Sequence, residues 1–509
     1  MIRSLLVLGG GSAGFLTALA LQSRLPHLPL KILRSKDIGI IGVGEGSTTT
    51  LGYHLHHYCN LDLATFYRMA EPQWKIGIRF EWGPRPFFNF IFGFELDTKY
   101  ELLSRGTGYY LDNNDAFDST GMQSRLMNEN KIWLRQANGM PRIVPDEFTY
   151  HLENEKFVTY LEHMALARGI EIVDDTAVDV VQDDHGISKL RLQSGGEISA
   201  DLYIDASGFR SQLLGQALGE PFYSYDDSLF CNRAVVGGWD REDEPIKPYT
   251  TAETMNHGWA FQIEHEFRIN RGYIFCSAFV SDTEAEAEFR AKNPKVRKTR
   301  FVPFKTGRYE RFWVKNVVAV GNSAAFVEPL EATSLGSICV QAQAIAETLA
   351  DCVGEPNPST IYNFNRQLNR GYDAVRDFLA LHYKFNCRID TPFWRECLEK
   401  VELHQVNRVV DFYKENGPSV LWRNILFDET AGKEFGYEGY LAMLVGLCAP
   451  YQTKFRPTEL ERQNWAKIQQ AFRNKVSTAY SVPEALALIR SESWRWPEKL
   501  YSRDQASRP

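Results

Sequence analysis

Residues 4–25, SLLVLGGGSAGFLTALALQSRL, decide the fold of this 509-residue chain. The run SLLVL reads as a buried strand, and the apolar spacing after Gly14 is typical of a helix. Between them, Gly9, Gly11 and Gly14 match the pattern GxGxxG. The first glycine of that pattern allows a tight turn, the second lets the backbone approach a pyrophosphate, and the third lets helix pack on strand. With a second strand at 30–34, LKILR, this predicts the opening of a dinucleotide-binding unit.

Composition and charge narrow the functional class. Hydrophobic residues make up 44% of the chain and charged residues 24%, which is typical of a globular enzyme. The net charge, 57 minus 64 or −7, argues against binding to nucleic acid or to an anionic membrane. No apolar run is long enough to span a bilayer. Aromatic residues reach 13%, an excess that a pocket for a flat aromatic substrate would leave.

Cysteines and histidines give no sign of a metal site. The 8 cysteines are scattered singly, without a CxxC pair or a zinc spacing. We therefore expect reduced thiols and a cytoplasmic protein. His54, His56 and His57 lie close together, but no carboxylate or cysteine completes a ligand set at a recognisable spacing. We predict that these three histidines lie on a helix surface and that the chain binds no metal.

The order of patterns along the chain predicts an α/β fold of two to four domains. Strand–turn–helix patterns return in the middle of the sequence and near residue 320, so the nucleotide domain is predicted to be discontinuous. We divide the chain into a nucleotide-binding domain of residues 1–50, 151–215 and 300–357, substrate-side elements of residues 51–150 and 216–299, and a mainly helical C-terminal region of residues 358–509.

The stretch WKIGIRFEW, residues 74–82, alternates strictly between large apolar residues and others. This pattern predicts one strand with Trp74 and every second residue after it on one face. Lys75 and Gly77 would lie on the other face. That face either meets water, where Lys75 has no special role, or lines an enclosed site, where Gly77 leaves space beside a working amine.

The cofactor evidence favours FAD, although one residue departs from the pattern. Arg34 stands where an acidic residue is expected after the second strand. Ser35 or Asp37 could still bind the ribose, or the arginine could suit the 2′-phosphate of NADP. Two segments, DASGFRS at 205–211 and AVGNSAAFVEPLEATSLG at 319–336, each follow a strand. In flavoproteins of the glutathione-reductase type, such segments close over the flavin. The predicted FAD contacts are Gly9, Gly11, Ser12, Ala13, Gly14, Arg34, Gly44, Glu45, Asp205, Gly321 and Leu335.

Taken together, the sequence resembles the flavin-dependent halogenases of the tryptophan-halogenase family over nearly its whole length. The matching motifs are GGGSAG at 9–14, GVGEG at 42–46, WKIGIRFEW at 74–82, DASGFRS at 205–211, GWAFQI at 258–263, GNSAAFVEPLEATSLG at 321–336, RDFLALHY at 376–383 and TPFW at 391–394. The combination is specific, although each motif alone is not. The resemblance implies a Rossmann-like FAD-binding domain with inserted substrate elements.

The resemblance also implies a reaction and its partners. In that family, FADH2, oxygen and a halide ion yield hypohalous acid, which travels through an internal tunnel to an aromatic substrate. The activating lysine falls on Lys75, the assisting glutamate on Glu331, and the halide-binding backbone on Thr333 and Ser334. The strap that links the two sites falls on residues 37–50. A separate NAD(P)H-dependent flavin reductase is implied, because the sequence has no separate NADH-binding loop, and a homodimer is allowed.

The chemistry of these positions is coherent. Hypohalous acid is a poor electrophile until its oxygen is hydrogen-bonded or protonated, which an ammonium does; an amine could instead carry the halogen as a haloamine. Burial lowers the pKa of a lysine and a nearby carboxylate raises it. Glu331 could be that carboxylate and could accept the proton that leaves the ring. We predict an extended turn that sends Glu331 and Thr333 to opposite faces.

The motif W-x-W-x-I-P of the family is altered here. Phe261 replaces its second tryptophan after Trp259, and Glu264 replaces its proline. Glu264 would bury a charge or form a new polar contact. Because the motif has been read as keeping substrate away from the flavin, a single-component FAD- and NADPH-dependent aromatic monooxygenase stays open as the alternative. Lys75 and EPLEATS count against it, since a hydroxylase needs no lysine in a second chamber. A flavin-binding protein without catalysis is the third hypothesis.

The substrate is predicted to be a small aromatic molecule, as plausibly another indole as tryptophan itself, with chloride or bromide as the halide. Phe90 and Phe92 alternate on one strand face just after the lysine strand, where they could hold an indole or a phenol between them. The equally supported alternative makes them core residues. With Trp259 and Phe261, they form the predicted substrate pocket. Ser334 stands where glycine is usual in the tryptophan-specific members, and it could change the halide preference.

Overall fold

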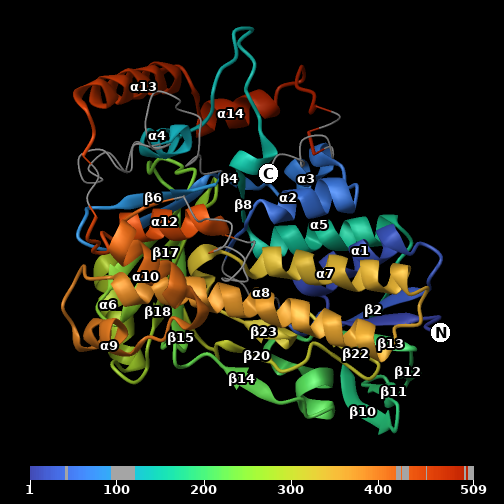
Figure 1. The fold of residues 1–509 in the computed structure, drawn as a ribbon. Helices are drawn as coiled ribbons and strands as arrows, with labels where there is room; N and C mark the ends of the chain where they lie inside the picture. Colours follow the sequence, from blue (N-terminus) through green and yellow to red (C-terminus); the bar gives the residue numbers. More distant parts are fainter. Residues whose placement is uncertain are drawn as a thin grey trace.

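The computed structural model describes residues 1–39, 44–92, 121–419, 426, 435–453, 456–497 and 500–501. It contains two large β-sheets with helices packed around them (Figure 1). A six-stranded sheet carries the N-terminal nucleotide-binding pattern, and a seven-stranded sheet carries the substrate-side segments. The predicted α/β, Rossmann-like fold class is confirmed.

The six-stranded sheet has the order β21-β22-β13-β1-β2-β9. Its strands are β1 (Leu5–Leu8), β2 (Leu30–Arg34), β9 (Glu171–Asp174), β13 (Leu202–Asp205), β21 (Trp313–Val314) and β22 (Val317–Ala319). All pair in parallel except β21 with β22. The four residues of β1 are buried, as expected for a parallel strand that is covered on both faces. These six strands come from the three ranges of the predicted nucleotide-binding domain.

Four helices stack beside this sheet. Figure 1 shows α5 (Asn154–Ala167), α1 (Ser12–Arg24), α7 (Ser334–Asp351) and α8 (Pro358–Phe385) as successive layers. The buried apolar residues of α1 and α7 belong to the same core cluster as the strands of the sheet. The opposite face of α7 turns toward α8.

The seven-stranded sheet has the order β19-β15-β18-β17-β16-β5-β6. Its strands are β5 (Gly77–Glu81), β6 (Phe88–Ile91), β15 (Arg233–Asp240), β16 (Thr250–Met255), β17 (Gly258–Glu264), β18 (Arg268–Phe275) and β19 (Thr299–Pro303). Only the pairing of β5 with β16 is parallel. Because β19 belongs to this sheet, the boundary predicted at residue 300 falls inside a substrate-side strand. We keep the predicted division into domains as a proposal, with that boundary moved beyond β19.

The predicted single strand at 74–82 is in fact two strands in different sheets. β4 (Gln73–Lys75) pairs with β8 (Thr149–Leu152) in a three-stranded sheet completed by β3 (Glu45–Gly46). The chain then leaves this sheet at Ile76, whose N–H donates to the carbonyl of Pro248 and whose carbonyl accepts from Phe92. Every second residue from Trp74 to Trp82 is buried, as the alternation predicted. The strand pairing, however, is interrupted after Lys75.

The C-terminal region is mainly helical, with one strand that returns to the middle of the chain. Its described helices of eight residues or more are α8, α9 (Pro392–Lys400), α10 (Asn407–Asn416), α12 (Gly436–Gly446), α13 (Glu459–Ser477) and α14 (Val482–Ile489). The strand β24 (Tyr480–Ser481) pairs with β7 (Lys131–Trp133). Among the described residues, none of the helices combines the length and the apolar composition needed to cross a membrane.

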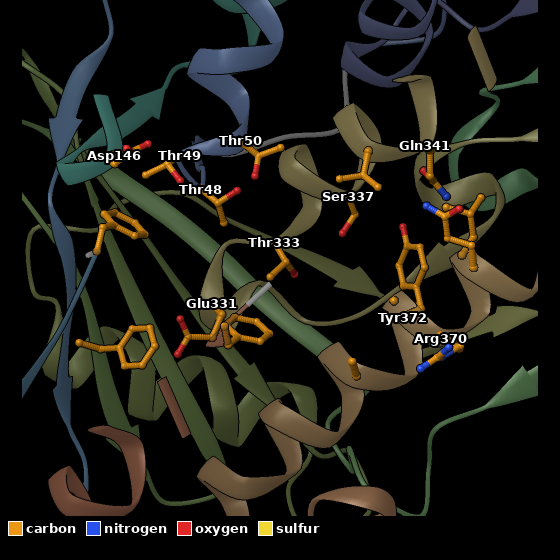
Figure 2. Close-up of a pocket in the computed structure, with 18 of the residues that line it drawn as sticks. Thr48, Thr49, Thr50, Asp146, Glu331, Thr333, Ser337, Gln341, Arg370 and Tyr372 are labelled. Atoms are coloured by element: carbon orange, nitrogen blue, oxygen red, sulfur yellow. The ribbon is translucent and has the colours of Figure 1, made fainter. Parts of the chain in front are cut away.

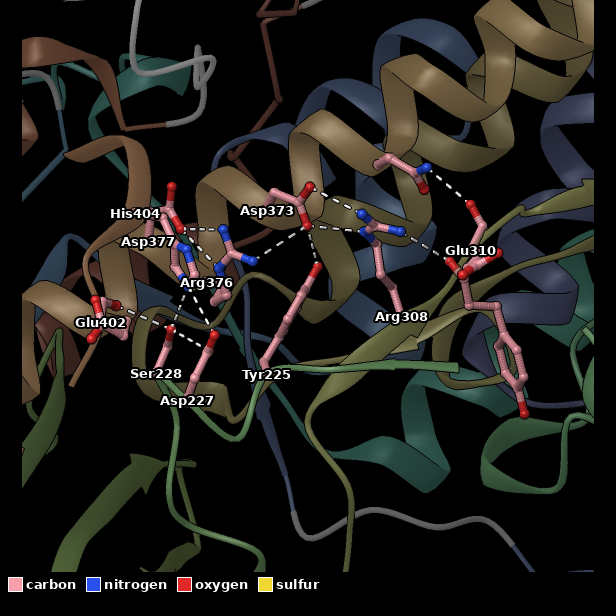
Figure 3. A network of polar contacts seen from close by, with 12 residues as sticks. Tyr225, Asp227, Ser228, Arg308, Glu310, Asp373, Arg376, Asp377, Glu402 and His404 are labelled. Carbon is pink, nitrogen blue, oxygen red and sulfur yellow. Dashed lines mark hydrogen bonds and ion pairs between the residues drawn. The ribbon is translucent and has the colours of Figure 1, made fainter. Parts of the chain in front are cut away.

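A buried polar network fixes the middle of α8. Asp373 accepts hydrogen bonds from the Tyr225 hydroxyl at 2.8 Å and from Nε of Arg308 at 2.9 Å, and Arg376 forms an ion pair with Asp377 at 2.7 Å (Figure 3). Arg376 and Asp377 are both almost fully buried. Buried charges need such partners. The network therefore sets the rotation of α8, which decides what its later residues face.

Candidate active site

The glycine turn after β1 is shaped to accept a phosphate group. A side chain at Gly9, where φ is +130°, would collide with the carbonyl oxygen of Ala206, and one at Gly14 would collide with the carbonyl oxygen of Gly9. At Gly11, by contrast, a Cβ atom would meet no described atom within 4 Å. Gly11 is also the N-cap of α1, and no side chain caps the helix. Uncapped N–H groups beside open space at a helix N-terminus fit a pyrophosphate.

Gly321 lies close to this turn, and both Gly321 and Leu335 have structural roles of their own. A Cβ atom at Gly321, where φ is +60°, would lie 2.9 Å from the methyl group of Ala13. The N–H of Gly321 donates to Oε1 of Gln341 at 2.9 Å. Leu335 is a buried core residue of α7. Gly321 thus brings the second strand–turn–helix pattern against the first turn of α1.

Arg34 and Asp205 are already occupied by protein groups. The guanidinium of Arg34 forms an ion pair with Glu162 and lies 3.6 Å from Asp174. Its charge is therefore compensated, which removes the reason for reading Arg34 as a 2′-phosphate site. Oδ2 of Asp205 accepts hydrogen bonds from the backbone N–H groups of Leu213 and Leu214, and Oδ1 accepts from Ser207. The Asp205 carboxylate holds its own loop in place.

Residues 40–43 of the predicted strap, which include the first two residues of GVGEG, lie outside the described residues. The rest of the strap is described. Gly44 has a φ of +91°, and a side chain there would strike Asn270 and His265. Glu45 accepts a hydrogen bond from Nδ2 of Asn154 at 2.7 Å. Burial raises the pKa of Glu45 above its usual value. At Gly46 and Ser47 the strap reaches Lys75.

Lys75 is enclosed completely by protein. Its side chain has no exposed surface, and Nζ donates one hydrogen bond, to the carbonyl oxygen of Ser47 at 3.1 Å. Nζ also lies 5.4 Å from the centre of the Phe92 ring. An ammonium has three N–H donors, so two have no hydrogen-bond acceptor among the described residues. Burial lowers the pKa of Lys75 to about 8, and the charge of Glu331 opposes that change.

Glu331 lies at the end of a one-turn 3₁₀ helix and is paired with a histidine. The turn η8 (Pro329–Glu331) is followed by Ala332 in the left-handed region, with φ of 56°. Oε1 of Glu331 lies 2.8 Å from Nε2 of His382, and both residues are buried. The predicted extended turn between Glu331 and Thr333 is therefore wrong. Ala332 turns the backbone through the left-handed region, and Glu331 and Thr333 both line the same cavity.

The position of the shared proton follows from the other ring nitrogen of His382. Nδ1 lies 2.8 Å from the carbonyl oxygen of Phe378, which can only accept, so Nδ1 carries a hydrogen. The contact between Nε2 and Glu331 then holds a single proton. Either an imidazolium faces a carboxylate, or a neutral imidazole accepts from a carboxylic acid. His382 stands in the motif RDFLALHY, but no pattern in the sequence assigned it a role.

Thr333 and Ser334 begin α7 directly after this turn. Thr333 is the N-cap and Ser334 the first helical residue, and no side chain caps the helix. The first N–H groups of α7 thus lack a capping side chain, close to the Glu331 carboxylate. A helix N-terminus of this kind attracts anions.

A cavity of about 960 Å³ opens beside the turn (Figure 2). Its wall includes Glu331, Thr333, Phe90 and Phe92, together with residues of α7 and α8. The cavity is therefore large for a pocket that holds a small molecule. Lys75 is not among the lining residues: it lies behind the wall, next to Phe92. This arrangement brings the two predicted catalytic residues, the predicted halide turn and the two phenylalanines together.

The other two predicted pocket residues lie elsewhere. Trp259 and Phe261 are buried in the second core cluster, and neither lines the cavity. The indole N–H of Trp259 donates to Oε2 of Glu328 at 3.2 Å. We therefore assign both rings to the core. Glu264 is fully buried and forms an ion pair with Arg241, so both expectations for this residue hold: it buries a charge and makes a new polar contact.

The three clustered histidines do not lie on a helix surface as a group. They form part of a π-helical turn, η1 (His54–Tyr58), in which His54 and His56 are buried. Burial lowers the pKa of each of these two to about 4. Nδ1 of His56 contacts the carbonyl of Leu61, and Nε2 of His54 contacts that of Leu16. The helix pattern did not show that α1 and α3 (Leu63–Met69) would cover this turn.

Known proteins resemble this chain over most of its length. The profile of the tryptophan halogenase family matches residues 4–446. A tryptophan 7-halogenase from Kutzneria sp. (strain 744) is 31% identical over 448 residues, 81% of this chain and 83% of the relative. A tryptophan 6-halogenase from Streptomyces albogriseolus is 29% identical over 449 residues, 82% of this chain and 83% of the relative.

Solved structures agree with these relatives. The crystal structure of a lanthipeptide tryptophan 5-halogenase has 35% sequence identity and a TM-score of 0.88, and the match covers 99% of this chain and 98% of that one. A flavin-dependent halogenase from Brevundimonas sp. BAL3 has 27% identity and a TM-score of 0.81, covering 96% of this chain and 99% of the other. The chain described here therefore belongs to the tryptophan halogenase family, a family of flavin-dependent enzymes.

Proposed function

We propose that this enzyme halogenates an indole-like aromatic ring, using chloride or bromide, and that Lys75 activates the hypohalous acid. The observation that carries this proposal is the enclosed ammonium of Lys75, which lies beside Phe92 and has two unused N–H donors. The negative charge of Glu331 raises the pKa of this ammonium. Reduced FAD, when bound, would supply hypohalous acid from oxygen and a halide ion. Residues of this chain would carry out the activation of the hypohalous acid, the removal of the ring proton and the binding of the halide.

Lys75 would act as the acid. With a pKa of about 8, roughly nine tenths of the amine is protonated at pH 7. Its N–H groups would bond to the oxygen of the hypohalous acid, so that the halogen–oxygen bond breaks as the halogen–carbon bond forms. The oxygen leaves as water with a proton from Lys75. An ammonium placed in this way acts in a low-dielectric site, where its effect on the transition state is largest.

Glu331 would complete the proton balance. The ring carbon that gains the halogen loses a proton, and Glu331 faces the cavity that would hold the ring. From Glu331, the proton would return to Lys75. The His382 side chain fixes the position of the Glu331 carboxylate and can share its proton. The N–H groups of Thr333, Ser334 and the first turn of α7 would hold the halide ion.

The substrate class follows from the relatives and from the cavity. The relatives act on tryptophan, and Phe90 and Phe92 in the cavity wall suit a flat ring. We also propose that a separate NAD(P)H-dependent reductase delivers the reduced flavin, and that the enzyme works in the cytoplasm. The paired state of Arg34 gives no support to direct use of NADPH.

The test is to supply FADH2, oxygen, and bromide or chloride with a panel of indoles and phenols, and to follow products by mass spectrometry. We expect a product in which halogen replaces hydrogen. Lys75→Ala should bind flavin and lose that product, whereas Lys31→Ala, which changes an exposed lysine, should keep it. Halogenation that survives in Lys75→Ala would remove Lys75 from the mechanism. A hydroxylated product formed without halide would favour the monooxygenase.

A further inference from the structure

The cavity beside Glu331 continues as a trough between α7 and α8. The α8 residues that line it are at positions 363, 366–368, 370–372 and 374, and all but 368 and 372 have the spacing of one helix face. Figure 2 shows Glu331 and Arg370 at separate ends of the group of lining residues, with Thr333 between them in this view. The trough is thus longer than the space around the catalytic carboxylate.

The outer part of the trough carries two arginines that the fold does not use. Arg366 and Arg370 are exposed, and neither forms an ion pair or a side-chain hydrogen bond with any described residue. Arg376 on the same helix is different, because it is buried and paired with Asp377 and Asp373. The guanidinium groups of Arg366 and Arg370 are therefore free to bind a carboxylate, which a guanidinium does in a bidentate manner.

These arginines lie too far from Glu331 to serve a free amino acid. His382, which contacts Glu331, comes twelve residues after Arg370 and sixteen after Arg366 on one continuous helix. At 1.5 Å per residue, the axial distances are about 18 Å and about 24 Å. In free tryptophan the carboxylate is three bonds from the ring, or about 4.5 Å at most. A ring held at Glu331 would leave both arginines without a partner.

A buried amide also faces the trough with one hydrogen-bond donor unused. Oε1 of Gln341 accepts from the N–H of Gly321, which fixes the orientation of the amide. Nε2 therefore remains as a donor, and it has no partner among the described residues, although Gln341 is only 1% exposed. A buried donor of this kind needs an acceptor, and a ligand in the trough would supply one. A backbone carbonyl group is the acceptor that an extended chain would bring.

We propose that the substrate is an indole side chain within an extended acidic peptide, which lies along the trough with its carboxylates at Arg370 and Arg366. This inference rests on the proposed halogenation of an indole and names the molecule that carries it. At about 3.3 Å per residue, the two distances correspond to acidic residues about five and seven positions from the tryptophan. The other charged lining residues, Asp146 and Glu331, would repel the acidic segment from the other end (Figure 2).

The test compares two peptides that differ only in charge. One carries a tryptophan with glutamates five and seven residues away, and the other carries glutamines at those positions. Each peptide is made in two versions, one with these polar residues on the N-terminal side of the tryptophan and one with them on its C-terminal side. Binding to the full-length protein is followed by fluorescence anisotropy, without flavin or turnover. We expect the acidic peptide to bind at least tenfold more tightly in one of the two directions. The double variant Arg366→Ala/Arg370→Ala should bind both peptides alike.

Three controls keep the result interpretable. Arg297→Ala changes an exposed arginine outside both described cavities and should keep the preference for the acidic peptide. Arg366→Lys/Arg370→Lys keeps the charge and should restore part of the preference. Halogenation is then measured with chemically reduced FAD and with flavin supplied by a reductase. A defect of the double alanine variant that appears only with the reductase would assign the arginines to reductase docking and overturn the proposal.

The outcomes separate this proposal from the proposed function. Equal binding of the two peptides by the unchanged protein would overturn the acidic-peptide proposal, even if the enzyme halogenates small indoles. Conversely, tight and arginine-dependent binding without halogenation of any indole would leave the peptide site in place and remove the proposed reaction. For a peptide that is a substrate, the double alanine variant should raise KM by at least tenfold with kcat nearly unchanged.

Discussion

Nε2 of His382 lies 2.8 Å from Oε1 of Glu331, and the two side chains share one buried proton. His382 touches no cavity space, so it acts through Glu331 as a positioning residue. The pair joins α8 to the turn that begins α7. Accepting the ring proton would give this neutral pair a positive charge, and the proton given up by Lys75 in the same reaction would keep the total charge of the buried site unchanged.

Replacing His382 should slow catalysis more than it weakens substrate binding. His382→Phe leaves the Glu331 carboxylate without its donor, and an unpartnered buried carboxylate takes up a proton at higher pH. We expect kcat to fall by about 10² with KM for the indole nearly unchanged. The acid limb of the kcat–pH profile should move to higher pH. Tyr383→Phe, which loses the contacts of its hydroxyl to Glu328 and Cys231 but none to Glu331, is the control; equal effects of both variants would contradict a specific role for His382.

Removing the charge of Lys75 should stabilise the protein while abolishing activity. The pKa of Lys75 is about 8 in the folded state and about 10.5 when unfolded, so the unfolded state binds more protons between these values. Burial of the ammonium thus costs stability below pH 8. Lys75→Met should raise the free energy of unfolding at pH 7 by up to about 3 kcal/mol. Denaturant titrations should show this difference shrinking from pH 8 to 10.5; a constant difference would mean that packing causes it.

Glu328 should give the opposite pH dependence. Burial raises its pKa from 4.5 to about 7, against the hydrogen bonds from Tyr383 and Trp259. The folded state therefore binds a proton that the unfolded state lacks between these values, and the stability of the protein falls as pH rises from 4.5 to 7. Glu328→Gln keeps an oxygen that can accept both hydrogen bonds. We expect it to unfold later than the unchanged protein at pH 8 and together with it near pH 4.5, as measured by chemical denaturation.

Two glycine variants should separate folding from flavin binding. Gly14→Ala places a methyl group against the carbonyl of Gly9, so it should lower Tm and reduce the yield of folded protein. Gly11→Ala has room for its methyl group among the described atoms, but that room is where a phosphate would approach. We expect Gly11→Ala to keep its Tm without flavin and to bind FAD at least tenfold more weakly, measured by quenching of flavin fluorescence. Unchanged FAD affinity in Gly11→Ala would place the pyrophosphate elsewhere.

The sequence predicted those parts of the fold and site that depend on local patterns. The strand–glycine–helix order placed β1 and α1 correctly, because each residue's role there is set by its near neighbours. The alternation around Lys75 showed that a second face needed an explanation. It did not show the break at Ile76, because the carbonyl of Pro248 and the N–H of Phe92 that cause it come from distant segments.

Contacts between distant segments also explain what else could not be predicted. His382 follows Glu331 by 51 residues, and only the packing of α8 brings them together. The charge of Arg34 looked free in the sequence, since Glu162 and Asp174 belong to other elements of the nucleotide-binding sheet and its helices. His54 and His56 looked exposed because the turn that contains them is polar. In each case the sequence showed the chemical type of the residue but not the residue that it contacts in the fold.

The two glutamates of the EPLE turn are hydrogen-bonded to adjacent residues of α8: Glu331 to His382, and Glu328 to Tyr383. A single residue inserted into α8 between Asp377 and His382 would rotate this pair by about 100° and detach both carboxylates together. The length of that helical segment is therefore fixed to the residue.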